Sequence, residues 1–203
     1  MFLYEHDGGV YLNLTNRCPV ACSFCVKTEW EHQFRGSDLN LRGREPSVEE
    51  IIAALEERLA QDPPPKEIVF CGFGEPTFRL DAIEAVGRWL RARSKKIPLR
   101  LNTVGLGDLI NGRDIVPDLA RWIDAVSVSL NTADPGRWLT LHRPAPAFRA
   151  EGFAASRDFA RKCVKAGLRT RVTAVDRPDA DLEALRAFAA GIGAEFLARP
   201  VLD

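Results

Sequence analysis

Two hydrophobic periods divide this chain into short strands and longer helices. Alternation with a period of two predicts strands at 2–5, 10–15, 67–71, 99–103, 125–130, 168–175 and 194–198. Apolar stripes with a period near 3.6 predict helices at 48–60, 80–93, 114–122, 150–166 and 179–190. The segment 26–46 is polar and carries no period, so we expect it to be irregular.

Turn and capping residues support the ends of several expected strands and helices. Asp7, Gly8 and Gly9 between the first two strands are typical of a hairpin. Ser47 followed by Glu50 predicts a capping box at the start of the first helix. Gly167 directly follows the expected helix 150–166, and glycine is common at this position after a helix.

Strands that alternate with helices predict a parallel sheet with crossover helices. A closed barrel of eight β/α units takes about 250 residues, whereas this chain has 203 and room for about six units. We therefore expect an α/β fold, a partial (β/α)6 TIM-like barrel, with a flat doubly wound sheet as the alternative. The whole of 1–203 is expected to be one domain, with a short N-terminal hairpin strand at about 1–9.

Several expected strands carry one polar face, although strands buried on both faces usually read as continuous apolar runs. In a barrel whose apolar faces meet the helices, these polar side chains would line the inside. They are Tyr11, Asn13, Thr15, Arg100, Asn102, Ser127, Ser129, Asn131, Arg171 and Thr173.

Charge and composition narrow the class of protein. The 28 basic and 28 acidic residues cancel, so no overall charge favours non-specific nucleic-acid binding. The N-terminal segment has no secretory pattern, and no run approaches the roughly 20 apolar residues that span a bilayer. We expect a cytoplasmic protein with reduced thiols and no membrane association.

Three of the five cysteines, Cys18, Cys22 and Cys25, lie within eight residues as C-x3-C-x2-C, directly after the second strand. Thiolates select zinc, copper(I) or iron–sulfur clusters. Structural zinc sites and ordinary four-iron clusters take four ligands, whereas the isolated Cys71 and Cys163 are interpreted as buried apolar residues. A zinc scaffold, or an iron–sulfur electron carrier or sensor, remains an alternative to a cluster with one open iron.

The cysteine motif, with aromatic Phe24 before the third cysteine, resembles the signature of the radical S-adenosylmethionine (SAM) superfamily. The loop Gly72-Phe73-Gly74-Glu75 resembles the second family motif, except that Phe73 replaces the usual glycine. The resemblance implies a [4Fe–4S] cluster on the three cysteines, with SAM on the fourth iron. It also implies reductive cleavage of SAM to a 5′-deoxyadenosyl radical, which abstracts hydrogen from an unidentified substrate.

By the same resemblance, a group of residues is expected to hold SAM: Phe24, Gly72, Phe73, Gly74, Glu75, Asn102, Ser127, Ser129, Asn131 and Thr173. Four segments, YLNLTNRC at 11–18, REPSVEEII at 44–52, VFCGFGEPT at 69–77 and the stretch 100–131, look like TatD-associated radical SAM proteins. That likeness implies a TatD-family partner. The radical SAM resemblance implies a one-electron reductant, flavodoxin-like or ferredoxin-like. An open barrel side would suit a large substrate or a partner.

Three further residues leave two interpretations each. Arg171 and Arg199, on the last two strands, could bind an anionic substrate or be solvated charges at strand ends. His142 is expected on a loop, where it could act as an acid or base or simply be exposed.

Overall fold

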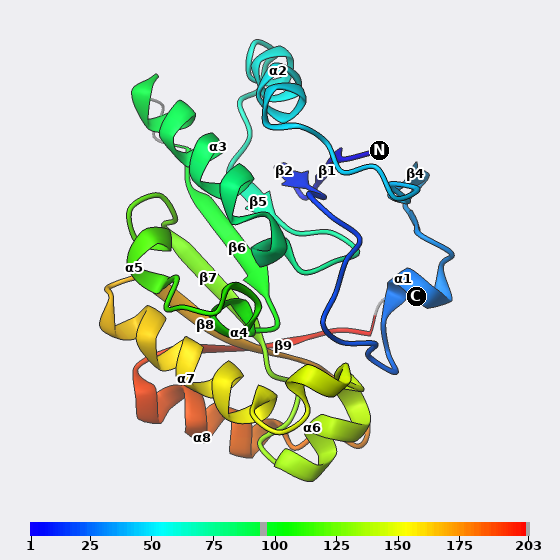
Figure 1. Ribbon diagram of the computed structural model, residues 1–203, viewed down its shortest axis with the longest axis vertical. Helices are drawn as coiled ribbons and strands as arrows, with labels where there is room; N and C mark the ends of the chain where they lie inside the picture. Colours follow the sequence, from blue (N-terminus) through cyan, green and yellow to red (C-terminus); the bar gives the residue numbers. More distant parts are fainter. Residues whose placement is uncertain (94–96, 202–203) are drawn as a thin grey trace.

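The computed structural model describes residues 1–93 and 97–201, and in that part seven strands form one sheet (Figure 1). In spatial order they are β1 (Leu3–His6), β2 (Gly9–Leu12), β5 (Ile68–Phe70), β6 (Leu99–Thr103), β7 (Ala125–Ser129), β8 (Arg169–Val175) and β9 (Glu195–Arg199). β1 pairs antiparallel with β2, and all later neighbours are parallel. Because the order follows the sequence without reversal, the fold is the expected partial barrel and not a doubly wound sheet.

Helices cover the outer face of this sheet. Figure 1 shows α3, α5, α7 and α8 along one side of the strands. The α-helices between β4 (Ser37–Asp38) and β9 in the sequence are α2 (Val48–Leu59), α3 (Leu80–Ala92), α4 (Gly107–Asn111), α5 (Val116–Leu119), α6 (Pro135–His142), α7 (Gly152–Lys165) and α8 (Leu182–Ile192). Short 3₁₀ helices occupy Pro76–Arg79 and Pro146–Phe148.

The main core lies between the apolar faces of the strands and these helices. Phe70, Leu101 and Val126 follow one another across β5, β6 and β7 in register and are fully buried. Ile83 of α3 and Phe159 of α7 belong to the same apolar cluster. With these faces turned to the helices, the alternate residues of β6, β7 and β8 point to the inside of the barrel.

The local signals in the sequence are confirmed. Ser47 accepts a hydrogen bond from the Glu50 amide, and the Glu50 carboxylate accepts one from the Ser47 amide. Gly167 follows α7 with a φ of +81°. Asp7 and Gly8 both have positive φ in the hairpin between β1 and β2.

Two segments are more ordered than the sequence predicts. The segment 26–46 contains α1 (Val26–Glu29) and a small hairpin of β3 (Gln33–Phe34) and β4 (Ser37–Asp38). The stretch after β7 contains α6, whose first turn is capped by Asp134, since its carboxylate accepts a bond of 2.6 Å from the Arg137 amide. Pro135 at the first helical position is a second signal of this helix start.

The inside of the barrel is covered at β2 but open beyond β9. The Asn13 amide donates to the Leu39 carbonyl at 2.8 Å, and the Thr15 hydroxyl donates to the Glu45 carboxylate. Asn13 and Thr15 therefore bind the 39–45 segment and do not line the lumen as expected. β1 and β9 end the sheet and are not paired with each other in the described part of the chain.

The proposal of one domain over 1–203 also includes 94–96 and 202–203, which lie outside the described residues. Among the helices that the structure describes, none has the length and apolar character needed to cross a bilayer.

Candidate functional site

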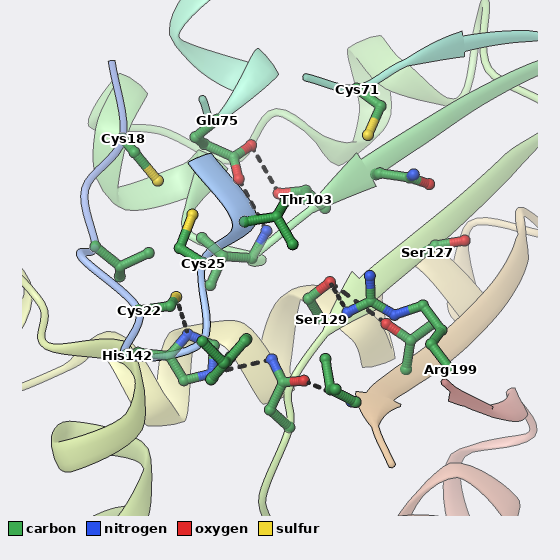
Figure 2. Close-up of a pocket in the computed structure, with 18 of the residues that line it drawn as sticks. Cys18, Cys22, Cys25, Cys71, Glu75, Thr103, Ser127, Ser129, His142 and Arg199 are labelled. Carbon is green, nitrogen blue, oxygen red and sulfur yellow. Dashed lines mark hydrogen bonds between the residues drawn. The ribbon is translucent and has the colours of Figure 1, made fainter. Parts of the chain in front are cut away.

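A cavity of about 480 Å³ opens at the carboxyl ends of the parallel strands, a size typical of cofactor sites. Its walls come from the cysteine loop, the loop after β5 and the inner faces of β6 to β9 (Figure 2). The residues expected at the site that line it are Cys18, Cys22, Phe24, Cys25, Gly72, Gly74, Glu75, Asn102, Ser127, Ser129, Asn131 and Thr173. The topology thus brings nearly the whole predicted set into one cavity.

The cysteine loop connects β2 to α1 and is fastened to the far end of α6. The amides of Ala21 and Ser23 donate to the carbonyls of His142 and Leu141, at 2.9 and 2.8 Å. Val20 forms an isolated bridge with Pro144. The position of the three thiols therefore depends on a helix that lies more than 100 residues later in the sequence.

Cys18 is an exposed residue and Cys22 is partly exposed, but protein atoms crowd around both sulfur atoms. Burial raises the pKa of Cys18 to about 12, and burial also raises the pKa of Cys22 above its ordinary value. Thiols in such a setting stay protonated until a metal replaces the proton. In the described part of the chain, no three His, Cys, Asp or Glu side chains converge on a point for a single ion.

The loop after β5 packs directly against the cysteine loop. The Glu75 amide donates to the Arg17 carbonyl at 2.8 Å. A Cβ placed on Gly74 would lie 2.2 Å from the Thr15 carbonyl oxygen, and one placed on Gly72 would lie 2.3 Å from the Asn13 Oδ1. Both glycines are required by close approach between chain segments.

The Glu75 carboxylate lies at the wall of the cavity and accepts four hydrogen bonds. Oε1 accepts from the Thr77 amide (3.2 Å) and from the hydroxyls of Thr77 and Thr103 (both 2.8 Å). Oε2 accepts from the Val104 amide at 2.8 Å. Burial raises the pKa of Glu75 and these donors oppose the rise, so a cationic ligand group at this carboxylate would favour its charged form.

The polar residues on the strands differ in the hydrogen bonds that they make to other groups of the protein. The Ser129 and Thr173 hydroxyls lie 3.4 Å apart across β7 and β8. Asn102 accepts a bond from the Arg100 guanidinium. Asn131, with a φ of +61°, accepts from the Val175 amide at 3.0 Å and holds its amide group 3.3 Å from His142 Nε2.

The two aromatic residues proposed for the cofactor are placed differently. Phe24 lines the cavity, with its ring edge-to-face against His142 and the Arg177 guanidinium 5.6 Å from its centroid. The Phe73 side chain instead packs in a separate apolar cluster with Tyr4 and Leu39. A contact between Phe73 and a cofactor would have to come from its backbone.

His142 is not the loop residue that the sequence suggests. It is the last residue of α6, is 1% exposed, and stacks on Trp138 with ring centroids 4.9 Å apart. Its Nδ1 lies 3.5 Å from Cys22 Sγ and its Nε2 lies 3.1 Å from the Leu130 carbonyl oxygen. Burial lowers its pKa to about 4, so the ring is neutral near pH 7 and supports the cysteine loop.

Sequence reasoning placed Cys71 and Cys163 alike, but the structure separates them. Cys163 is fully buried in the main core. Cys71 lines the cavity and lies apart from the three clustered thiols in Figure 2. Thr103 and Val104, which hold Glu75, carried no motif from which their role could be predicted.

Residues 12–189 match the family model of the Radical SAM superfamily. The match covers most of the chain, and this protein therefore belongs to the radical SAM superfamily. Members of that superfamily are enzymes that use a [4Fe–4S] cluster and SAM. The cofactors of this protein are therefore a [4Fe–4S] cluster and SAM. Such enzymes typically need a reductant.

Solved structures show the same fold at low identity. Streptococcus suis SuiB, bound to precursor peptide SuiA, matches with a TM-score of 0.65 and 18% identity, over 93% of this chain and 38% of SuiB. SuiB bound to SAM gives 0.63 and 17%, over 95% and 38%. A radical SAM methyltransferase from Sphaerobacter thermophilus gives 0.53 and 16%, over 98% and 68%.

The hydrogenase maturase HydG from Carboxydothermus hydrogenoformans matches with a TM-score of 0.63 and 16% identity, over 96% of this chain and 44% of HydG. The chain thus spans less than half the length of SuiB or HydG. No curated protein matches it.

The residues at the cavity fit the two cofactors. Three thiols from one loop face the same space, and each would ligate a different iron of a four-iron cluster, so they need not converge on one point. Gly74 leaves no room for a side chain beside the thiol loop, and the buried Glu75 carboxylate suits an ammonium group. The donor set and the cradle agree with a cluster that carries SAM.

Proposed function

We propose that this protein is a radical SAM enzyme in which Cys18, Cys22 and Cys25 hold the cluster. The observation that carries the proposal is the shared cavity, where these thiols face the Gly72–Glu75 loop. When bound, the two cofactors supply one-electron reductive cleavage of SAM, which leads to hydrogen-atom abstraction from a substrate. The substrate is unidentified.

The chain's own residues bind, orient and shield. Glu75 offers a buried carboxylate to the SAM amino group, while the backbone at Gly72 and Gly74 allows close approach. We assign Asn102, Ser127, Ser129, Asn131 and Thr173, which line the cavity from β6 to β8, to the remaining polar groups of SAM. Phe24 lines the same cavity, and we assign it to the cofactor as well.

The open edge of the barrel supports a large substrate or a partner. β9 ends the sheet, and Leu197 and Val201 at the cavity are 39% and 52% exposed. SuiB, which shares the fold, has been crystallised with a precursor peptide. We propose a substrate that reaches the cavity from outside the barrel edge.

The finer family assignment stays a proposal based on the segments 11–18 and 69–77. These segments, with 44–52 and 100–131, resemble TatD-associated radical SAM proteins, and on that resemblance we propose a TatD-family partner. A flavodoxin-like or ferredoxin-like protein is the reductant that we propose.

The test is production of 5′-deoxyadenosine after anaerobic reconstitution, reduction with dithionite and addition of SAM. We expect product from the wild type and none from Cys18→Ala, Cys22→Ala or Cys25→Ala. Cys163→Ala, a cysteine in the core away from the cavity, is the matched control and should retain activity. An intact four-iron cluster that neither yields product nor responds to SAM would favour an electron carrier or sensor.

A further inference from the structure

Four arginines line the cavity, and they differ in how their charge is balanced. Three have a carboxylate partner: Arg100 with Glu67 at 2.7 Å, Arg171 with Glu195 at 2.8 Å, and Arg177 with Asp179 at 3.1 Å. Within 1–93 and 97–201, Arg199 has no such partner. The two arginines that the sequence could not distinguish, Arg171 and Arg199, are thereby separated.

Arg199 is the last residue of β9, and its guanidinium extends into the cavity (Figure 2). One Nη2 bond to the Ser129 hydroxyl, 3.4 Å long, is the hydrogen bond that its side chain makes there. Its Nε is buried and has no partner in the described part of the chain. Most of the five donors of this guanidinium are therefore unused.

Arg199 is partly buried, and its charge faces no carboxylate in the described part of the chain. A buried charge without a counter-ion destabilises a protein unless hydrogen bonds or an opposite charge compensate it. Burial lowers the pKa of Arg199, as expected for a guanidinium that has lost water without gaining a carboxylate. A guanidinium remains charged in proteins, so the charge is retained inside the cavity.

The unused donors face the space that a ligand enters. In Figure 2 the guanidinium lies on the other side of the cavity from Cys18 and Glu75, where we place the cluster and the SAM amino group. A planar fork of N–H groups matches the paired oxygens of a carboxylate or phosphate.

We propose that Arg199 binds an anionic group, a carboxylate or phosphate, of the substrate. This assignment rests on the proposed function, because it presumes that the cavity holds a substrate beside the cofactors. The carboxylate of SAM has the same chemistry, and the cluster is also negatively charged. The experiment below separates these sources.

Inorganic phosphate is the probe. It is added to the full chain, first in the cluster-free form and then in the cluster-loaded form. The thermal unfolding midpoint is measured against phosphate concentration at constant ionic strength. Ligand binding to the folded state raises this midpoint. We expect an apparent phosphate affinity about ten-fold or more weaker in Arg199→Met than in the wild type, as for loss of a charged hydrogen-bond donor.

Arg171→Met is the matched control, because Arg171 lines the same cavity but is paired with Glu195. It should keep the phosphate response of the wild type. Arg199→Met should fold, since it removes a partly buried charge that has no carboxylate partner among the described residues. Arg199→Lys, which keeps the charge but loses the fork, should retain part of the response.

Several results would overturn the proposal. No phosphate response in the wild type, or an equal response in Arg199→Met, would show that Arg199 is not an anion site. A response that disappears on cluster loading would assign the arginine to the cluster charge. A ten-fold weaker SAM affinity in Arg199→Met, measured from the cluster spectrum, would assign it to the SAM carboxylate.

Failure of the proposed function gives a different result. A cluster-loaded wild type that releases no 5′-deoxyadenosine would contradict the radical SAM activity. The phosphate response of the cluster-free chain does not depend on that activity, so the two outcomes are independent.

Discussion

Gly74 is the point at which the two loops of the site touch most closely, and its replacement by alanine tests the arrangement. A Cβ there would lie 2.2 Å from the carbonyl oxygen of Thr15 and 2.6 Å from that of Arg17. Both atoms belong to the backbone, so no rotation of a side chain relieves the contact. The two loops must separate instead.

The size of the effect follows from these distances. Real Cβ atoms do not approach closer than 3.0 Å, so the loops must move apart by roughly 0.8 Å in a close-packed region. That shift lengthens the 2.8 Å bond from the Glu75 amide to the Arg17 carbonyl beyond hydrogen-bonding range. Overpacking costs about 1–3 kcal/mol and a lost hydrogen bond about 1 kcal/mol, so we expect Gly74→Ala to destabilise the chain by about 2–4 kcal/mol.

Two measurements check this expectation. Urea unfolding of the cluster-free chain gives the change in free energy. Iron bound per chain after reconstitution reports the thiol loop, because Arg17 immediately precedes Cys18. We expect less iron in Gly74→Ala than in the wild type.

Gly191→Ala is the control, because Gly191 lies in α8 with no heavy atom near its would-be Cβ within 4 Å. Alanine is a better helix former, so this variant should be more stable by about 0.5–1 kcal/mol and bind iron normally. If Gly74→Ala unfolded at the wild-type urea concentration and bound as much iron, the packing of the two loops would be wrong.

Three further predictions follow from buried polar contacts. Glu75→Gln should destabilise the chain by about 1–3 kcal/mol in urea, because either orientation of the amide sets its NH₂ against a donor such as the Val104 amide. The Arg100 guanidinium lowers the pKa of Glu67 below 4.5. The wild type should therefore be more stable than Glu67→Gln above pH 4.5 and should lose this advantage as the pH falls below 4.5. Urea midpoints measured over a pH series check this prediction. His142→Phe should lower the thermal midpoint, at a cost of about 0.5–1.5 kcal/mol for the lost bond to the Leu130 carbonyl, which keeps its bond from the Thr132 amide. Differential scanning calorimetry of the cluster-free chain checks this prediction.

The sequence by itself determined the elements and the chemistry of the ligands. Period and capping are local properties, so the Ser47–Glu50 box, the hairpin at Asp7 and the terminus at Gly167 could be predicted. The spacing of Cys18, Cys22 and Cys25 is also a local property, and it indicated the three residues that we propose as cluster ligands. α6 carried a usable signal in Asp134 and Pro135, although it was not predicted.

Only the tertiary structure decided which distant residues meet. Cys22 and His142 lie 120 positions apart and come together because α6 folds back onto the thiol loop. Phe73 shares a loop with Gly74 yet faces a different apolar cluster. Arg171 and Arg199 are alike in sequence, but strand register pairs Arg171 with Glu195 and leaves Arg199 in the cavity. Such contacts depend on how the sheet curves and on what covers each edge, and no local pattern encodes either.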